Sequence, residues 1–340
     1  MLALPISLVV ALALGFLLIR TLIAKPHSWP IPLLLAASAA QGVINALAQY
    51  YGLNAVRLAQ PVTAAMIPPL AWLALQATLV RPFEPSRDLV HLAVPVFVAF
   101  CALVAPDTLD FAVPAVFALY ALAMVLAVRG GADGLPMSPL GDGEWPPWAW
   151  RGVAAALALS AVSDLLIFAA HVFRADWMKP WLISLVSSLS LLLLGALALA
   201  GGTQADAELT PEPERPDAAV PVDAARDAAI LNQLDTLLVE QRLFLDPDLT
   251  LSRLARRLGL PAKQVSGAIN RPTGENVSRY VNAHRIRHAC ALLRAGSGVT
   301  TAMLESGFNT KSNFNREFQR VAGVSPTQWR ALAPPPLPPP

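Results

Sequence analysis

The sequence predicts an all-α protein in two parts, a polytopic bundle of membrane-spanning helices and a small helical domain that follows it. Of the 340 residues, 55% are hydrophobic and only 14% are charged, whereas charged residues make up about a quarter of an ordinary soluble protein. The charge is also divided unevenly. Residues 1–200 hold nine Lys or Arg and nine Asp or Glu, while residues 249–340 hold thirteen Lys or Arg against three Glu. Such an excess of positive charge predicts that the second part binds a polyanion.

The first part is expected to contain about seven membrane spans. A helix needs about 20 largely apolar residues to cross the roughly 30 Å of hydrocarbon in a bilayer. No basic residue precedes Arg20, so the first stretch lacks the positive start of a cleavable signal peptide and is interpreted as a retained span. The segments that reach or approach the required length are 3–23, 31–50, 62–80, 89–105, 109–128, 148–173 and 180–200.

The basic residues between these spans predict the orientation of the chain. Positive residues concentrate in the short loops on the cytoplasmic side of a membrane. With the N-terminus outside, six basic residues fall in inner loops and three in outer ones, and seven spans then leave the residues after 202 in the cytoplasm. The inner set is Arg20, Lys25, Arg81, Arg87, Arg129 and Arg151, and the outer set is Arg57, Arg174 and Lys179.

Two groups of polar residues lie inside expected spans. Gln41, Asn45 and Gln49 share a helical stripe in the second span, and Asp164 and His171 lie two turns apart in the sixth. Polar side chains within a membrane usually face the interior of the bundle. One interpretation is hydrogen bonding between helices, worth about 0.6 kcal/mol per bond. The other is a site that senses protons, a cation or a polar ligand.

A flexible tether is expected to join the two parts. Residues 203–222 are rich in Pro, Ala and acidic residues and have no periodic apolar pattern, which is typical of a disordered linker. A helical pattern begins at Asp223, with Ile230, Leu234 and Leu238 at helical spacing and Leu237 beside them. One interpretation is that this stripe packs on the domain that follows. The alternative is that part of it also pairs two chains in a homodimer.

The domain begins with a helix-turn-helix pattern. Leu251, Leu254 and Leu258 form the apolar side of its first helix, and Gly259 supplies the turn. The next helix, 261–270, buries Val265 and is expected to turn polar residues outward. These are Lys263, Gln264, Ser266 and Asn270.

A second helix-turn-helix pattern follows after a longer helix at about 276–294. Residues 299–308 form its first helix, 307–310 its turn, and 311–320 a polar helix that buries Phe314 and Phe318. The second helix of such a unit lies in the major groove of DNA. Asn and Gln can bond adenine edges, and Arg and Lys can bond guanine. The candidates for DNA contact here are Lys311, Ser312, Asn313, Asn315 and Arg316.

Basic residues outside the two polar helices have a less specific expected role. Arg253, Arg256 and Arg257 of the first unit are interpreted as contacts to the DNA backbone or as a solvated face. Arg279, Arg285, Arg287 and His288 of the long middle helix are expected to be solvated or to form salt bridges.

The region 225–330 resembles the DNA-binding domain of the AraC family of bacterial transcription regulators. The resemblance implies seven helices, two recognition helices in successive major grooves on one face of DNA, and control of nearby promoters. The sequence departs from the family pattern at Ala302 and Met303, at Ile269, and at Gly267, where a mid-helix glycine costs about 1 kcal/mol relative to alanine. The resemblance rests on Leu249-Thr250-Leu251 with Leu254-Ala255, Asn282 to Arg285 with Ala289 and Leu292-Leu293, Gly307-Phe308, Ser312-Asn313-Phe314 with Phe318, and Gly323 with Ser325-Pro326 and Trp329-Arg330.

The leading hypothesis is a membrane-embedded, one-component transcription regulator of the bacterial inner membrane. Its expected domains are a transmembrane sensor at 1–202, a linker at 203–222, a DNA-binding domain at 223–332 and a Pro-rich tail at 333–340. The expected partners are double-stranded DNA, the lipid bilayer, a small-molecule or ionic signal, and RNA polymerase if the protein is an activator.

Two alternatives to this hypothesis stay open. One is a transporter or membrane enzyme with an autoregulatory tail, and the other is a regulator whose spans serve only as an anchor. The chain has no P-loop and no Gly-rich dinucleotide motif. Cys101 and Cys290 lie in different parts of the chain, without metal-ligand residues nearby. We therefore expect no enzyme activity, no cofactor and no metal.

Overall fold

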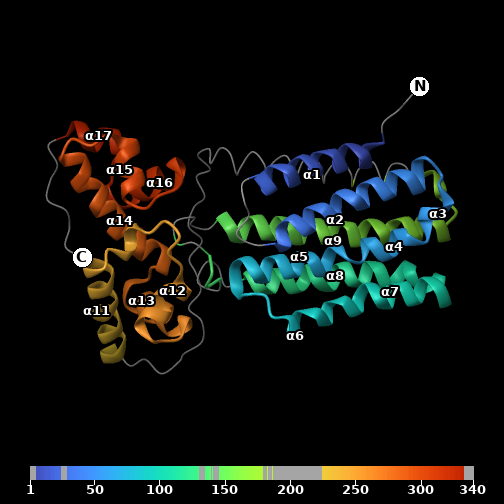
Figure 1. The fold of residues 1–340 in the computed structure, drawn as a ribbon, viewed down its shortest axis with the longest axis horizontal. Coiled ribbons are helices and arrows are strands. Elements are labelled where there is room, and N and C mark those ends of the chain that lie inside the picture. Colours follow the sequence, from blue (N-terminus) through green and yellow to red (C-terminus); the bar gives the residue numbers. More distant parts are fainter. Residues whose placement is uncertain are drawn as a thin grey trace. The chain divides into compact units, whose positions relative to one another are not determined.

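The computed structural model describes residues 5–23, 29–129, 135–138, 140, 145–178, 182, 186 and 224–332. Two compact units emerge from the contacts between residues, and every element in the described ranges is helical (Figure 1). The first unit comprises residues 1–129 and 148–198, and the second comprises 130–147 and 199–340. The predicted seventh span, 180–200, the linker and the Pro-rich tail lie essentially outside the described residues.

The first unit consists of long apolar helices, several of them interrupted. Single turns of π-helix or 3-10 helix extend some of them, Pro85 begins the short helix α6, and Pro68 and Pro69 lie in the first turn of α5. The elements are α1 (Ile6–Ile23), α2 (Pro30–Asn45) with η1 (Ala46–Tyr50), α3 (Asn54–Arg57), α4 (Ala59–Ala64), α5 (Ile67–Leu75) with η2 (Gln76–Val80), α6 (Pro85–Asp88), η3 (Leu89–Leu92), α7 (Ala93–Val104), η4 (Pro106–Thr108), α8 (Leu109–Val128), α9 (Trp145–Val172) and η6 (Asp176–Met178).

Six helical segments of the described residues are long and apolar enough to cross a membrane. They coincide with the first six predicted spans to within a few residues, except that the third begins earlier. The six segments are Ile6–Ile23, Pro30–Tyr50, Ala55–Val80, Pro85–Val104, Pro106–Val128 and Trp148–Val172.

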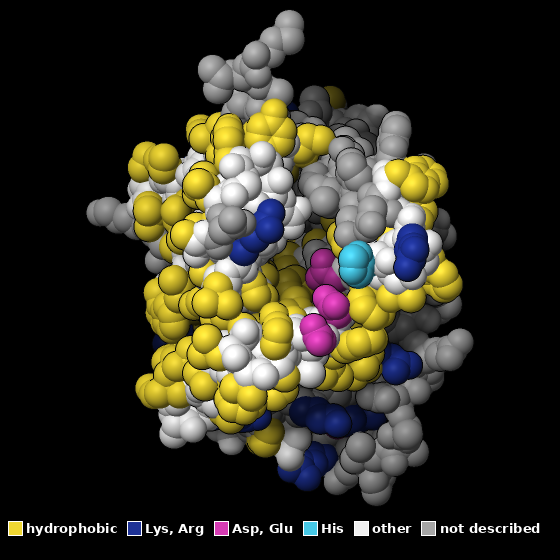
Figure 2. Space-filling model, turned by 90° about the vertical axis from the view of Figure 1, so that its right-hand side faces the viewer, with side chains coloured by type: hydrophobic (Ala, Val, Ile, Leu, Met, Phe, Trp, Pro, Cys, Tyr) yellow, Lys and Arg dark blue, Asp and Glu magenta, His cyan; other side chains and the backbone are white. Residues whose placement is uncertain are grey.

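Large apolar side chains cover the outside of this unit. Phe16, Phe100, Leu103 and Leu119 are each more than half exposed, and hydrophobic side chains dominate the end of the unit in Figure 2, with a few acidic side chains and a histidine among them. A monomeric soluble protein rarely exposes contiguous apolar patches of this extent. The surface therefore suits a hydrocarbon solvent.

Close packing between the first two helices depends on a glycine. A Cβ atom at Gly42 would lie 2.9 Å from the Cβ of Ala11 and 2.9 Å from the carbonyl oxygen of Ser7. Lipid does not drive apolar helices together, so small residues that let backbones approach closely are the usual means of packing in a membrane. Gly42 permits such a close approach between α1 and α2.

Residues 224–332 of the second unit form the seven helices that the resemblance implies. Thr250 caps the first helix of the first helix-turn-helix by accepting a hydrogen bond from the amide of Arg253, and Ser325 with Gln328 forms a capping box on the last helix. The helices are α11 (Ala224–Glu240), α12 (Leu251–Leu258), α13 (Ala262–Thr273), α14 (Val277–Arg294), α15 (Val299–Glu305), α16 (Lys311–Ala322) and α17 (Pro326–Ala331), with the 3-10 turn η7 (Leu243–Leu245) after α11.

Two apolar cores lie along the long helix α14. One holds Leu234 and Leu238 of α11 with Leu254 and Val265 of the first helix-turn-helix, and the other holds Phe314 and Phe318 of the second. The expectation that the helix from Asp223 packs on the domain is therefore confirmed for its stripe, because Leu234 and Leu238 are fully buried.

A buried arginine connects the two cores. The side chain of Arg285, on α14, is 0% exposed. Its Nε and Nη2 atoms donate to the carbonyl oxygens of Phe244 (2.7 Å) and Asp246 (2.8 Å), and its guanidinium lies 5.7 Å from the ring of Phe308 in the second helix-turn-helix. The expectation of a solvated Arg285 is wrong, because the side chain is buried and the carbonyls of Phe244 and Asp246 accept two of its hydrogen bonds.

Gly307 lies against the same turn. Its φ is +80°, and a Cβ atom there would lie 2.8 Å from the carbonyl oxygens of Phe244 and Leu245. Gly259, in the turn of the first unit, has a φ of +68° but has open space around the position of a Cβ atom. Both turns need a left-handed residue, and only the second also needs a missing side chain.

We predict that Gly307→Ala lowers the free energy of unfolding of residues 223–340 by about 3 kcal/mol or more, because strain and a backbone clash act together. Gly259→Ala is the matched control and should cost only about 1 kcal/mol, the price of a left-handed alanine. Urea unfolding followed by circular dichroism measures both. Equal losses would contradict the close approach of Gly307 to η7.

Candidate functional site

The first candidate recognition helix, α13, presents only part of its predicted set to solvent. Lys263 is exposed, and Gln264 and Asn270 are half-buried. Ser266 is 9% exposed, so the expectation that it faces outward is wrong in this conformation. The accessible surface of α13 therefore lies at its N-terminal end, around Lys263 and Gln264.

An ion pair holds α13 against α11. The Nε atom of Arg271 donates to Asp227 Oδ2 at 2.6 Å, and this hydrogen bond holds the pKa of the Asp227 carboxyl below its usual range. A Cβ atom at Gly267 would lie 2.7 Å from Nη1 of Arg271. The mid-helix glycine therefore makes room for the guanidinium that crosses to α11.

The contact between α11 and α13 adds a residue that the sequence pattern did not indicate. Arg226 Nη2 donates to Gln264 Oε1 at 3.2 Å. This contact brings a basic side chain of α11 to the accessible end of α13. No motif marks Arg226, since only the folded contact with a candidate base-reading residue identifies it.

The second candidate recognition helix, α16, is more open. Lys311, Asn315 and Arg316 are exposed and Ser312 is half-buried. Asn313 is 1% exposed, and its Oδ1 accepts a hydrogen bond from Arg316 Nη2 at 2.5 Å. Asn313 therefore does not face outward as predicted, and its side chain instead orients the guanidinium of Arg316.

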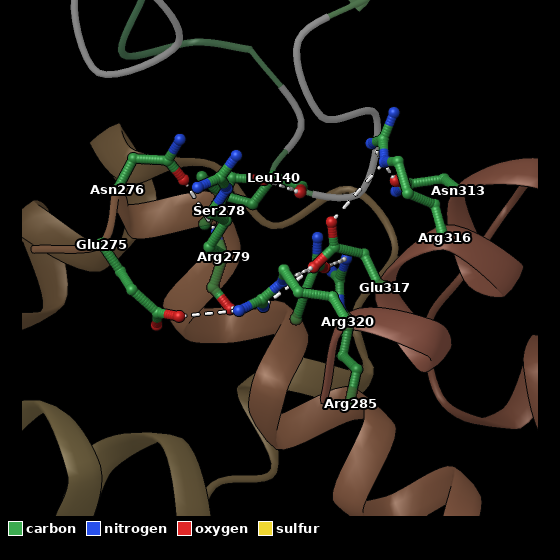
Figure 3. Close-up of polar contacts among 11 residues, drawn as sticks. Leu140, Glu275, Asn276, Ser278, Arg279, Arg285, Asn313, Arg316, Glu317 and Arg320 are labelled. Carbon is green, nitrogen blue, oxygen red and sulfur yellow. Dashed lines mark hydrogen bonds and ion pairs between the residues drawn. The ribbon is translucent and has the colours of Figure 1, made fainter. Parts of the chain in front are cut away.

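The far end of α16 is tied to α14 and to the loop before it (Figure 3). Arg320 donates through Nη1 to Glu275 (2.7 Å), through Nη2 to the carbonyl of Arg279 (3.0 Å) and through Nε to Glu317 (2.9 Å). These bonds fix the orientation of α16 relative to the spacer helix. The exposed residues near its N-terminus consequently have a defined position.

All three arginines of α12 are exposed, as the interpretation as a solvated face expects, and two of them also contact neighbouring side chains. Arg253 forms an ion pair with Asp246 at 2.6 Å, and Arg257 Nη1 donates to Gln241 at 2.9 Å. Arg256 is exposed. Arg253 and Arg257 therefore also support the fold locally in this conformation. A contact between Arg256 and the DNA backbone stays a prediction.

In the helix bundle, two of the three predicted polar residues of α2 belong to a network with α4. Thr63 Oγ1 donates to Gln41 Oε1 at 2.6 Å, and Gln60 Nε2 donates to Asn45 Oδ1 at 3.1 Å. Gln41 Nε2 also donates to Asn45 Oδ1 at 3.0 Å. Gln49 is exposed and lies one to two turns further along the chain. The network matches the hydrogen-bonding interpretation of this stripe for Gln41 and Asn45.

The other predicted pair lies on α9. Asp164 is half-buried, beside the buried Ser163, whereas His171 is exposed near the end of the helix. The two residues share one helix and lie seven positions apart. The carboxyl of Asp164 is therefore partly enclosed, whereas the imidazole of His171 is accessible. A role of either residue in sensing stays a prediction.

Comparisons with known proteins agree with the tandem geometry of the second unit. Residues 254–332 match a family model described as a helix-turn-helix domain. The melibiose operon regulatory proteins of Escherichia coli K12 and Escherichia coli O6:H1 are each 32% identical over 89 residues, which is 26% of this chain. The chain spans 30% of the length of these relatives, and no solved structure matches it. The C-terminal unit of the chain is therefore a helix-turn-helix domain of the AraC type.

Proposed function

We propose that the protein is a membrane-embedded, one-component transcription regulator that binds specific DNA sequences through its two helix-turn-helix units. The observation that carries this proposal is the presence, on one chain, of six helices of membrane-spanning length and an AraC-type domain. The exposed residues of α16 and the accessible end of α13 supply the polar and basic side chains that base reading requires.

The relatives support a regulatory role for the DNA-binding domain. Their name states that they regulate the melibiose operon. For this chain we infer control of promoters, without transferring the operon. One competing function is a transporter or membrane enzyme with an autoregulatory tail. Another is a regulator whose bundle serves only as an anchor, and the Asp164 experiment below tests that alternative.

The proposed topology places the DNA-binding domain in the cytoplasm of a bacterium. The distribution of Arg and Lys between loops favours an N-terminus outside, and an odd number of spans is needed to bring the domain inside. DNA is there, together with RNA polymerase if the protein activates transcription. The signal reaches the domain from the bundle without a phosphorelay.

The central test is DNA binding by residues 223–340. Because residues 249–340 of this fragment have a large excess of positive charge, its affinity for duplex DNA should fall about a thousandfold or more between about 50 and 200 mM salt, as expected for six or more phosphate contacts. Fluorescence anisotropy at several salt concentrations measures the slope. Lys311→Ala should reduce the slope by about one. A folded fragment with no salt dependence would overturn the proposed function.

The pairing of Arg316 with Asn313 gives a second test. Arg316→Ala should relax base preference at one or two positions of the binding site, by about 1 to 3 kcal/mol each. Asn313→Ala should relax the same positions, because Asn313 orients the Arg316 guanidinium. Selection of bound sequences from a random duplex pool measures both.

Arg253→Ala is the control for this pair, since the Arg253 side chain is engaged with Asp246. It should leave base preference unchanged. If Asn313→Ala relaxes a different position from Arg316→Ala, Asn313 reads a base itself.

The third test concerns sensing in the bundle. Asp164→Asn should leave membrane insertion and DNA binding intact but hold transcription output in one state, because a polar group in a span biases the bundle only if its environment differs between two arrangements. A promoter reporter assayed over a range of external pH and cation concentrations measures the response.

Asp107→Asn, which alters an exposed carboxyl in η4, is the control and should respond like the parent. A normal response by Asp164→Asn would assign the residue a structural role and direct the search to Gln41, Asn45 and Gln49. If no variant of either group alters the response, the bundle serves as an anchor.

A further inference from the structure

The connection between α8 and α9 packs on the DNA-binding domain. Residues 130–147 belong to the same compact unit as the C-terminal residues. Leu140 is 6% exposed and lies in the core that contains Leu249, Leu254 and Val277. Leu135 is also buried. A loop that only joined two spans would not be expected to bury a leucine in a core formed by another part of the chain.

Backbone hydrogen bonds hold this segment at the first helix-turn-helix. The amide of Leu140 donates to the carbonyl of Leu249 at 2.8 Å, and the amide of Ser252 donates to the carbonyl of Pro136 at 2.8 Å. On the other side, the hydroxyl of Ser278 donates to the carbonyl of Leu140 at 2.6 Å (Figure 3). The described residues 135–138 and 140 are here named the docking segment.

Two of these three hydrogen bonds involve residues at helix N-termini. Ser252 is the second residue of α12, and Ser278 is the second residue of α14. Free amides at helix N-termini bind phosphate groups, and they supply many of the contacts between proteins and the DNA backbone. The first helix of a helix-turn-helix crosses that backbone. The carbonyl of Pro136 thus occupies an amide of the kind that a DNA phosphate would use.

The charge of the connection has the same sign as that of DNA. Residues 130–147 contain Asp133, Asp142 and Glu144 and no Lys or Arg. The domain on which the docking segment packs carries the largest excess of positive charge in the chain. The connection therefore has the sign of charge that a basic domain attracts.

We propose that the docking segment is an intramolecular ligand of the DNA-binding domain that competes with DNA. The inference rests on the proposed function. In the docked state, the segment occupies the N-termini of α12 and α14 and weakens DNA binding. Because the segment is continuous with α8 and α9, a rearrangement of these two helices changes the fraction of docked molecules and so the DNA affinity.

The test uses the full chain in detergent micelles and a fluorescent duplex of random sequence at low salt. Leu140→Asp should release the segment and tighten DNA binding about tenfold or more, because the burial of a leucine side chain is lost from the docked state. Leu140→Ala should give a smaller gain. Leu140→Met, which conserves volume, is the matched control and should bind DNA like the parent.

Hydrogen exchange measured by mass spectrometry supplies the second readout. In the parent, peptides containing the amides of Leu140 and Ser252 should be protected, and added DNA should speed exchange at Leu140 while α14 stays protected. Leu140→Asp should show fast exchange at Leu140 without DNA. Protection of Leu140 that persists in the DNA complex would overturn the inference.

The outcomes separate this inference from the proposed function. If Leu140→Asp and Leu140→Ala release the segment but bind DNA no more tightly than the parent, competition is refuted while DNA binding stands. If no form binds duplex DNA at low salt although α16 is protected from exchange, the proposed function fails and the inference with it. If Leu140→Asp also loses protection in α14, the DNA affinities of Leu140→Ala and Leu140→Met decide whether the segment competes with DNA. Tighter binding by Leu140→Ala than by Leu140→Met supports competition, and equal binding refutes it.

Discussion

The buried guanidinium of Arg285 is the interaction on which the geometry of the DNA-binding domain depends. An arginine without solvent access is stable only when its donors are satisfied. Here the carbonyls of Phe244 and Asp246 and the side chain of Asn282 accept its hydrogen bonds, and the ring of Phe308 covers it. One side chain therefore holds η7 and the turn of the second helix-turn-helix to the same helix. The two candidate recognition helices inherit their relative orientation from this contact and from the bonds of Arg320.

Much of the fold follows from patterns that are local in the sequence. Hydropathy alone located six helical segments of the bundle, because a membrane imposes a minimum apolar length that few other structures need. The turns at Gly259 and Gly307 were equally predictable, since a left-handed residue must stand there. The stripe of α11 followed from its helical period, and its burial in the core that it shares with α12 and α13 confirms the simpler of the two interpretations.

Other features depend on contacts between residues distant in the sequence, and no local pattern carries them. Asn313 reads as an outward polar residue of a recognition helix, yet it is buried beside Arg316. Gly267 reads as a weak point, yet the guanidinium of Arg271 fills the space that its missing side chain leaves. The packing of Leu140 joins residues more than a hundred positions apart, and nothing in the composition of a Gly/Pro-rich loop indicates where it would dock.

The length and rigidity of the spacer helix α14 also constrain the DNA that the protein can bind. Its 18 residues measure about 27 Å at 1.5 Å per residue, and the contacts at both of its ends allow little bending. A rigid spacer helix of this kind requires a fixed distance along the DNA between the two short recognition sequences. An insertion of roughly five base pairs between them would place one recognition sequence on the opposite face of the double helix. The spacing of the two recognition sequences in a target promoter is thereby constrained together with their bases, and insertions or deletions between them would be selected against just as base changes within them are.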